Sequence, residues 1–468
     1  TRDLEAMKAN GIAGYQLFEA GSGIPIGPVE SLSDEWVDLI LHTLKESERL
    51  GLEFAMHNCP GWSSSGGPWI TPDKAMQIIR WSETKITGGK QVRIQLPTPK
   101  HMFDYYIDTY CLAIPANMKV IPRLSILELS NRLDKDGVLT WDVPTGEWLI
   151  MRFGQTAKDQ KNKSAPSKST GLDCDKFSTE ALDYHLNCMF KRLMPAMEKI
   201  AKHSKIGLLI DSYETGDQDW TSDMPAYFEQ SHGYELYPFL PVLANKIVES
   251  EESTKRFLFD FRRVRADMFA ERYYGHFQKR CKEKGIITYT EPYGGNMMEE
   301  LQVAQQLDIN MGEFWCGQTV LWANYKYNRT VKQVASIAHT LGGKVVGAEA
   351  FTSEPDADKW LQYPYALKSL GDYMFTRGLS RIYFHRFAHQ PHPTAAPGMT
   401  MGAWGLHFDR TNTWWKPGKA WIEYLNRCQY IFQSSTFYGD ILYHNGDDSF
   451  GSTIEPDQTL LAPPEGYD

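Results

Sequence analysis

The sequence predicts a (β/α)8 TIM barrel whose first strand is missing, interrupted by an inserted antiparallel β-sandwich domain. Seven short apolar strands alternate with helical stretches, and the first visible element is a helix. Such alternation favours parallel strands, and one further strand upstream of Thr1 would complete the eight of a barrel. The alternative is an open doubly wound sheet. Its phosphate-binding loop is not found, because GSGIPIG at residues 21–27 has the wrong spacing and does not open a helix.

Residues 1–83 are expected to form the first part of the barrel. The short apolar runs GYQLFEA and EFAMHN read as its first two visible strands. The stretch between them, SDEWVDLILHTLKESERLGL, carries apolar residues at helical spacing, with an N-cap at Ser33 or Asp34 and a stop at Gly51. We therefore expect a helix to connect these strands.

Residues 84–175 show a different pattern, in which short β-like runs alternate with turns. The runs include KQVRIQL, YYIDTYCLAI and LTWDVPTGEWLIMRFG. This pattern is typical of antiparallel strands, so we expect an inserted β-sandwich. Its role stays open, since such an insertion could bind substrate or cover the mouth of the barrel.

The remainder of the barrel is expected at residues 176–435, where the α/β alternation resumes. Strands are predicted at 205–214, 285–295, 306–315, 344–351 and 381–389. Helices are predicted at 179–203, at 223–283 with a break near 237–241, and at 330–343, 365–380 and 417–433. Residues 436–468 are expected to begin a further C-terminal domain, and the chain is expected to be a fragment cut at both ends.

The composition excludes several classes of protein. The 468 residues carry a net charge of −9 without a basic tail or stripe, so neither nucleic acid nor an anionic membrane is an expected partner. No apolar run has the length of a membrane span. The seven Cys residues form no CxxC pair, which argues against a zinc ribbon or a disulfide framework, and most are expected as buried thiols.

Polar side chains stand at the carboxyl end of every predicted barrel strand. They are Glu19, His57, Asn58, Asp211, Glu214, Glu291, Glu313, Glu349, His385 and Arg386. Any one of them alone would be read as a helix cap or a surface charge. Because the carboxyl ends of parallel barrel strands share one mouth, the whole set predicts an acidic active site there. Aromatic residues are expected at its edge, namely Tyr213, Tyr293, Phe314, Trp315 and Phe351.

Several carboxylates without an evident nucleophile indicate glycoside hydrolysis. That reaction needs one carboxylic acid to protonate the leaving oxygen and a second carboxylate to activate water or attack the anomeric carbon. Further carboxylates would bind sugar hydroxyls or a hard cation such as Ca²⁺. Other chemistries have weaker support. The chain has no HExxH or GxSxG motif, and Cys59 precedes a proline without a visible partner.

Seven motifs spread along the chain form a recognisable set. They are MHNCPGWSSSGGPWITPDKAMQIIRWSE, GLDCDKFS, DSYETG, EPYGG, MGEFW, VVGAEAFTS and YFHRFAHQP. Together they resemble glycoside hydrolase family 106, the α-L-rhamnosidases, over nearly the whole chain. The resemblance implies an inverting hydrolase that releases terminal α-L-rhamnose from plant glycans such as pectin or from rhamnosylated small molecules. It also implies a carbohydrate partner, a Ca²⁺ ion in the active site, and a periplasmic or secreted location.

The resemblance also assigns roles where the motifs match. The catalytic pair falls on Glu214 of DSYETG as general acid and on Glu349 of VVGAEAF as general base, while Glu313 of MGEFW falls near the metal. An inverting pair implies carboxyls roughly 6.5–9.5 Å apart. Substrate-binding roles are expected for His57, Asn58, Asp211, Glu291, Trp315, His385 and Arg386, with Trp62 as a second candidate for stacking on the sugar.

Two other classes of function remain compatible with the sequence. One is a non-catalytic carbohydrate-binding barrel, in which the carboxylates only hold sugar hydroxyls. The other is a metal-dependent hydrolase of a different class, in which Glu313, Asp211 and the histidines would hold a transition metal. The presence of all three glutamates of the motif set favours the glycoside hydrolase. No motif indicates the glycan linkage, the aglycone or the oligomeric state.

Overall fold

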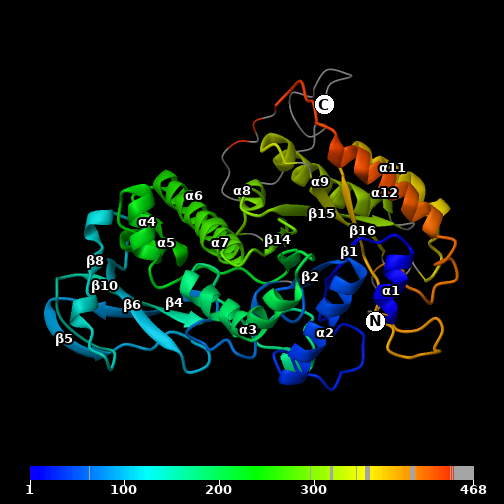
Figure 1. Cartoon of the computed structure of the whole chain (residues 1–468). Helices are drawn as coiled ribbons and strands as arrows, with labels where there is room; N and C mark the ends of the chain where they lie inside the picture. The colour runs from blue at the N-terminus through cyan, green and yellow to red at the C-terminus, as the bar shows by residue number, and fades with distance from the viewer. Residues whose placement is uncertain are drawn as a thin grey trace.

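A seven-stranded parallel sheet forms the centre of the protein in a computed structural model (Figure 1). The structure describes residues 1–62, 64–295, 297–316, 320–343, 345–353, 359–400, 405, 407–442, 444 and 446, with side chains of 320–328 left out. The sheet order is β1-β2-β12-β14-β15-β16-β17, and each neighbouring pair is parallel. The strands are β1 (Gly14–Leu17), β2 (Glu53–His57), β12 (Ile206–Ile210), β14 (Ile287–Thr290), β15 (Ile309–Cys316), β16 (Val346–Ser353) and β17 (Arg381–Phe384).

The sheet curls into a nearly closed barrel. Among the described residues, β1 and β17 are its two edges, yet Arg381 of β17 forms an ion pair with Glu53 of β2. Strands so far apart in the sheet order can share this contact only if the sheet bends back on itself. All seven strands expected from the sequence are present, so the predicted α/β fold with a parallel barrel is confirmed. The eighth strand stays a prediction.

Helices connect the barrel strands and cover their outer side. They are α1 (Arg2–Ala9), α2 (Asp34–Leu50), α3 (Thr179–Ile200), α4 (Met224–His232), α5 (Leu240–Leu243), α6 (Glu251–Met268), α7 (His276–Lys282), α8 (Glu300–Ala304), α9 (Val320–Thr340), α11 (Pro364–Thr376) and α12 (Lys419–Ser434). The limits of α2 follow its sequence. The Ser33 hydroxyl accepts a hydrogen bond from the Trp36 N–H, and Gly51 ends the helix in the left-handed conformation that glycine adopts without steric cost.

The helical region after β12 has the predicted break. A 3₁₀ turn at Tyr237–Phe239 and the short α5 separate α4 from α6. A π-helical turn at Phe269–Gly275 then joins α6 to α7. Helix α9 begins at Val320, earlier than the expected 330, because the run VLWANYKYNR before Thr330 is also helical.

The insertion consists mainly of antiparallel strands that lie beside the barrel, at the left of Figure 1, although β7 pairs in parallel with a later strand. A four-stranded sheet has the order β4 (Gln77–Thr87), β10 (Glu147–Ala157), β6 (Tyr106–Pro115) and β8 (Leu127–Glu128), and a separate pair contains β5 (Lys90–Gln95) and β9 (Val138–Val143). Short pairs join β3 (Gly66–Gly67) to β11 (Leu172–Asp173) and β7 (Val120–Ile121) to β13 (Ile247–Val248).

Alternation along β6 explains how the insertion packs. Leu112 and Ile114 belong to the large core of the barrel and its helices, whereas Cys111 and Ala113 belong to a smaller core shared with β9. Successive side chains of a strand point to opposite faces, so the four-stranded sheet is buried on both sides.

Strand β4 begins at Gln77, before the expected boundary. The sandwich description and the domain limits stay predictions, and most of 436–468 lies outside the described residues.

The expectation that most cysteines are buried thiols agrees with the described residues. All seven cysteines are free, and five of them are buried. Among the helices of the described part of the chain, none combines the length and the apolar character that a bilayer crossing requires.

Candidate active site

A cavity of about 1540 Å³ occupies the barrel and reaches the carboxyl ends of its strands. Most residues predicted for the site line it, namely Asp211, Glu214, Glu291, Glu313, Trp315, Glu349, His385 and Arg386. Trp62 lines it too. The expectation that strand ends deliver their polar groups to one place therefore holds for these residues.

Four carboxyls meet inside the barrel because of strand position. Asp211 directly follows β12, and Glu291 directly follows β14. Glu313 and Glu349 are register partners on the neighbouring strands β15 and β16, so their side chains leave the sheet on the same face. Carboxylate oxygens of Asp211, Glu291 and Glu349 all lie within 4.8 Å of one another. We call these three residues the carboxylate cluster.

Burial raises the pKa of each of these acids, and their mutual repulsion adds to it. Burial, with repulsion from Glu349 and Glu214, raises the pKa of Asp211 to about 7. Burial, with repulsion from Glu214, raises the pKa of Glu349 to about 7. The pKa of Glu313 rises to about 8 for the same two reasons, and that of Glu291 rises well above its usual value. In the absence of a cation, these acids therefore hold several protons near neutral pH.

Tyr293 provides independent support for a proton among these acids. Its hydroxyl oxygen lies 2.6 Å from Glu291 Oε2 and 2.8 Å from Glu313 Oε2. A hydroxyl has one proton to donate, so it can donate to only one of the two carboxylates. A proton on the other carboxyl would let it donate to the Tyr293 oxygen, so the arrangement fits a proton held among these acids.

Glu313 is fixed by its neighbours. Its Oε1 accepts a 2.9 Å hydrogen bond from the Trp315 indole, and its Oε2 lies beside Tyr293. Both oxygens are therefore engaged, and Glu313 stands next to the carboxylate cluster and outside it. Its bond also orients Trp315 in the cavity wall.

Glu349 has a different set of partners. The Thr352 hydroxyl donates to its Oε1, and His385 Nδ1 lies 3.7 Å from the same oxygen. Burial and the neighbouring Arg386 lower the pKa of His385 to about 3, so the imidazole is neutral. The contacts to Thr352 and His385 both reach Oε1.

Glu214 lies at the rim of the cavity, where water has more access. The Ser212 hydroxyl donates to its Oε1 over 3.1 Å, and Lys163 forms an ion pair with its Oε2. The Glu214 side chain is 36% exposed, compared with 18% for Glu349. The two glutamates of the predicted pair thus share one cavity but differ in burial.

His57 and Asn58 do not line this cavity, although both were expected to contact substrate. The Asn58 side-chain amide donates to the Leu209 carbonyl over 2.9 Å, and His57 Nδ1 lies 3.1 Å from the Cys59 carbonyl. Each residue is only 2% exposed. Their polar atoms form hydrogen bonds within the fold, so His57 and Asn58 lie behind the site and support it.

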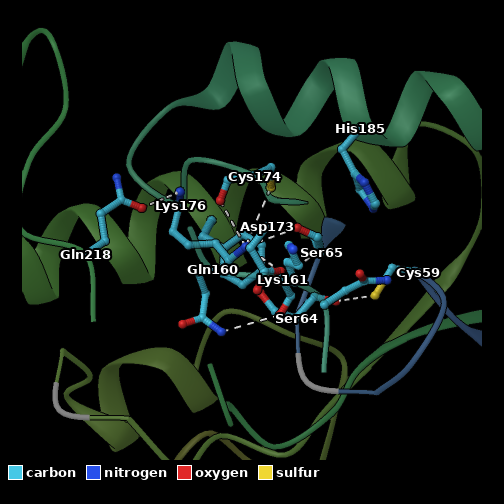
Figure 2. A network of polar contacts seen from close by, with 12 residues as sticks. Cys59, Ser64, Ser65, Gln160, Lys161, Asp173, Cys174, Lys176, His185 and Gln218 are labelled. Carbon is cyan, nitrogen blue, oxygen red and sulfur yellow. Dashed lines mark hydrogen bonds and ion pairs between the residues drawn. The ribbon is translucent and has the colours of Figure 1, made fainter. Parts of the chain in front are cut away.

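A buried polar network lies beneath the loop that follows β2 (Figure 2). Lys176, fully buried, donates to the carbonyls of Ser65 and Cys174 at 3.1 and 3.0 Å and lies 3.5 Å from Asp173 Oδ1. Its ammonium also lies 5.1 Å from the centre of the Tyr273 ring. Burial opposes the charge of Lys176, but the neighbouring Cys174 and Asp173 outweigh it and raise its pKa.

Two residues of this region were not predicted from the sequence. Lys163 belongs to the polar loop 158–171, and Lys176 belongs to the motif GLDCDKFS. Lysine in a polar loop, or among aspartates, normally indicates a solvated surface. The only sequence signal for Lys176 is its place inside a family motif.

A parallel barrel whose strand ends gather carboxyls in one cavity is the arrangement of a barrel glycoside hydrolase. The family model described as alpha-L-rhamnosidase, of glycoside hydrolase family 106, matches residues 1–106 and 100–468. The chain belongs to this family.

Two relatives show how far the similarity extends. A protein of Formosa agariphila named "Putative beta-glucuronidase" is 39% identical over 96% of this chain. A solved rhamnosidase from Novosphingobium sp. PP1Y superposes over 96% of this chain with a TM-score of 0.87 at 22% identity, which establishes the shared fold. The chain spans 40% of the first relative and 59% of the second.

Proposed function

We propose that this chain carries the catalytic barrel of an inverting α-L-rhamnosidase that releases terminal α-L-rhamnose from plant polysaccharides or small rhamnosides. The supporting observation is a pair of glutamates at one cavity, with Glu349 in the buried carboxylate cluster and Glu214 at the rim. Inverting hydrolysis uses two such carboxyls on opposite sides of the bond to be cleaved. Membership of the rhamnosidase family supports the choice of sugar.

In this proposal Glu214 is the general acid and Glu349 the general base. Glu214 must carry a proton before this step, and it gives that proton to the glycosidic oxygen of a leaving group that sits at the rim. Glu349 takes a proton from the attacking water, and the Thr352 hydroxyl, which donates to its Oε1, orients the carboxyl. Arg386, His385 and Trp315 line the same cavity and would bind the sugar ring and its hydroxyls.

We further propose a Ca²⁺ ion held by the carboxylate cluster of Asp211, Glu291 and Glu349. The residues fit such an ion because they offer only oxygen donors within 4.8 Å of one another. In addition, Glu291 Oε1 is buried without a hydrogen-bond partner, as expected of an atom shaped for a ligand. Glu313, the residue expected to bind the metal, would instead border it through Tyr293. A bound divalent ion supplies positive charge that keeps adjacent carboxylates ionised and attracts hydroxyl oxygens.

Ca²⁺ is expected to raise the melting temperature of the chelator-treated protein, and Glu291→Gln is expected to remove most of that rise. Binding to the folded state alone stabilises it by about 2.7 kcal/mol when the ion is at a hundred times its Kd. The measurement is thermal unfolding across a Ca²⁺ titration, with Mg²⁺ as the control ion, because Mg²⁺ prefers a smaller octahedral shell. A wild-type melting temperature that stays constant up to millimolar Ca²⁺ would contradict the site.

The function is tested with aryl α-L-rhamnoside and the full-length protein. Release of phenol, with β-L-rhamnose as the first sugar seen by NMR, is the expected result for inversion. The panel includes an aryl β-D-glucuronide, because one relative is named a putative β-glucuronidase. Binding of rhamnosides without release would indicate the non-catalytic alternative, and release of glucuronate alone would replace the proposed sugar.

Two structural expectations are carried forward with this proposal. An eighth strand between β1 and β17 would close the barrel, since both strands pair on one side only among the described residues. The antiparallel insertion would form the proposed sandwich, with one core shared with the barrel and another of its own. Action on plant polysaccharides would place the enzyme in the periplasm or outside the cell.

A further inference from the structure

We propose that Lys163, on the segment that returns from the antiparallel insertion, is a positioning residue for Glu214. The proposal rests on the function proposed above, because Lys163 would hold one of the two proposed catalytic carboxyls in position. Glu214 has its Oε1 held by the Ser212 hydroxyl over 3.1 Å and its Oε2 held by the Lys163 ammonium. With one donor on each oxygen, the plane of the carboxylate is defined from both sides.

The segment that carries Lys163 is fixed by its neighbour Asn162. Asn162 is 3% exposed, and its side-chain amide donates to the carbonyls of Pro60 and Ser169 at 2.8 and 3.2 Å. Its side-chain oxygen accepts from the Gly171 N–H at 2.7 Å. One buried side chain therefore ties the segment to the loop after β2 and to its own far end.

The backbone of Lys163 is also held in place. Its carbonyl accepts from the Trp62 N–H at 3.4 Å, and the next carbonyl, of Ser164, accepts from the Gly21 N–H at 2.7 Å. A Cβ on Gly61 would lie only 2.1 Å from the Lys163 carbonyl, so the two backbones approach as closely as glycine allows. The backbone of Lys163, from which the side chain extends, is therefore fixed between two loops at the mouth of the barrel.

The same segment rests on the buried network of Figure 2. The Asp173 N–H donates to the Gln160 carbonyl at 2.9 Å, and the Asn162 N–H donates to the Gly171 carbonyl at 3.1 Å. Asp173 is in turn the partner of the buried Lys176. The insertion therefore does more than sit beside the barrel, because its returning segment brings a cation to the rim of the active site.

The inference is tested by Lys163→Ala and Lys163→Arg in the full-length enzyme. Misplacing a catalytic carboxyl slows turnover without weakening ground-state binding, so Lys163→Ala is expected to lower kcat about tenfold while KM changes less than about twofold. Lys163→Arg, which keeps the charge, is expected to recover most of kcat. If Glu214 is the acid, the loss is expected to be larger for an alkyl rhamnoside than for a nitrophenyl rhamnoside, whose leaving group needs less protonation.

Lys168→Ala is the matched control. Lys168 lies on the same segment, its side chain is 49% exposed like that of Lys163, and its partner is Glu30 at 3.3 Å. It does not line the cavity. Unchanged kinetics of Lys163→Ala, or equal losses in both alanine variants, would overturn the inference.

A second measurement does not depend on catalysis. Trace acetylation followed by peptide mass spectrometry reports how strongly a carboxylate protects a lysine amine. Replacing Glu214 with Gln is expected to raise acetylation of Lys163 at least about twofold and to leave Lys168 unchanged. An inactive wild-type enzyme that still shows this difference would defeat the proposed function and keep the contact. Equal acetylation of Lys163 in both proteins would defeat the contact itself.

Discussion

Replacing Glu349 or Glu214 with Gln is expected to lower kcat on aryl α-L-rhamnoside by about 10²–10⁴-fold, because in the proposed mechanism each carboxyl moves a proton in the transition state. Gln keeps the shape of the side chain but cannot exchange a proton. Glu19→Gln is the control. Glu19 also follows a barrel strand and is held by the Trp36 indole at 2.9 Å, but it does not line the main cavity. Activity of that variant is expected to stay within about twofold of the wild type.

The two variants should also differ from each other, and the difference decides which glutamate gives the proton. Loss of the general acid spares substrates with a good leaving group, whereas loss of the general base does not. Glu214→Gln is therefore expected to keep far more activity on dinitrophenyl rhamnoside than Glu349→Gln. Azide, which needs no general base, should restore turnover only to the base variant. The opposite pattern would exchange the two roles, and full activity of either variant would remove it from the pair.

Replacing Lys176 with Met is expected to lower the free energy of unfolding by about 3–5 kcal/mol, because it leaves Asp173 buried without its cation. Both side chains have no exposed surface, and Lys176 Nζ lies 3.5 Å from Asp173 Oδ1. The measurement is urea unfolding followed by fluorescence. Lys168→Met, at an exposed position, should have no measurable effect.

A variant that fails to fold would still leave this prediction testable. The double variant Lys176→Met with Asp173→Asn removes both charges, and a buried pair can often be replaced by neutral groups at little cost. The double variant is therefore expected to recover much of the lost stability. An unchanged urea midpoint for Lys176→Met alone would show that the ion pair does not hold this part of the fold together.

The barrel could be predicted from the sequence because its signals are local. The short apolar runs of β12 and β16, and the cap and stop of α2, depend only on residues near each other in the chain. The gathering of Asp211, Glu291 and Glu349 could also be expected, since parallel strands place their carboxyl ends together.

The supporting residues could not be predicted, because their partners are set by the path of the chain through the insertion. Lys163 meets Glu214 only because the returning segment passes between two barrel loops. His57 and Asn58 stand at a strand end like the cavity residues, yet Cys59 and Ser65 of the loop after β2, together with Leu209 of β12, use their polar atoms. Strand position predicts which end of the barrel a side chain reaches, and neighbouring loops determine whether it faces the cavity.

The crowding of acids in the barrel also has a consequence for the whole protein in solution. Folding raises the pKa of Asp211 and Glu349 to about 7 and that of Glu313 to about 8, so between roughly pH 4 and pH 8 the folded chain binds protons that the unfolded chain has lost. Stability from these groups is therefore complete in acid and declines as the pH rises through that range. Binding of the proposed divalent ion to the carboxylate cluster would release into the solvent the protons that its carboxyls hold. With the proposed ion, acidification would favour the protonated cluster without metal, and mild alkali would favour the metal-loaded cluster.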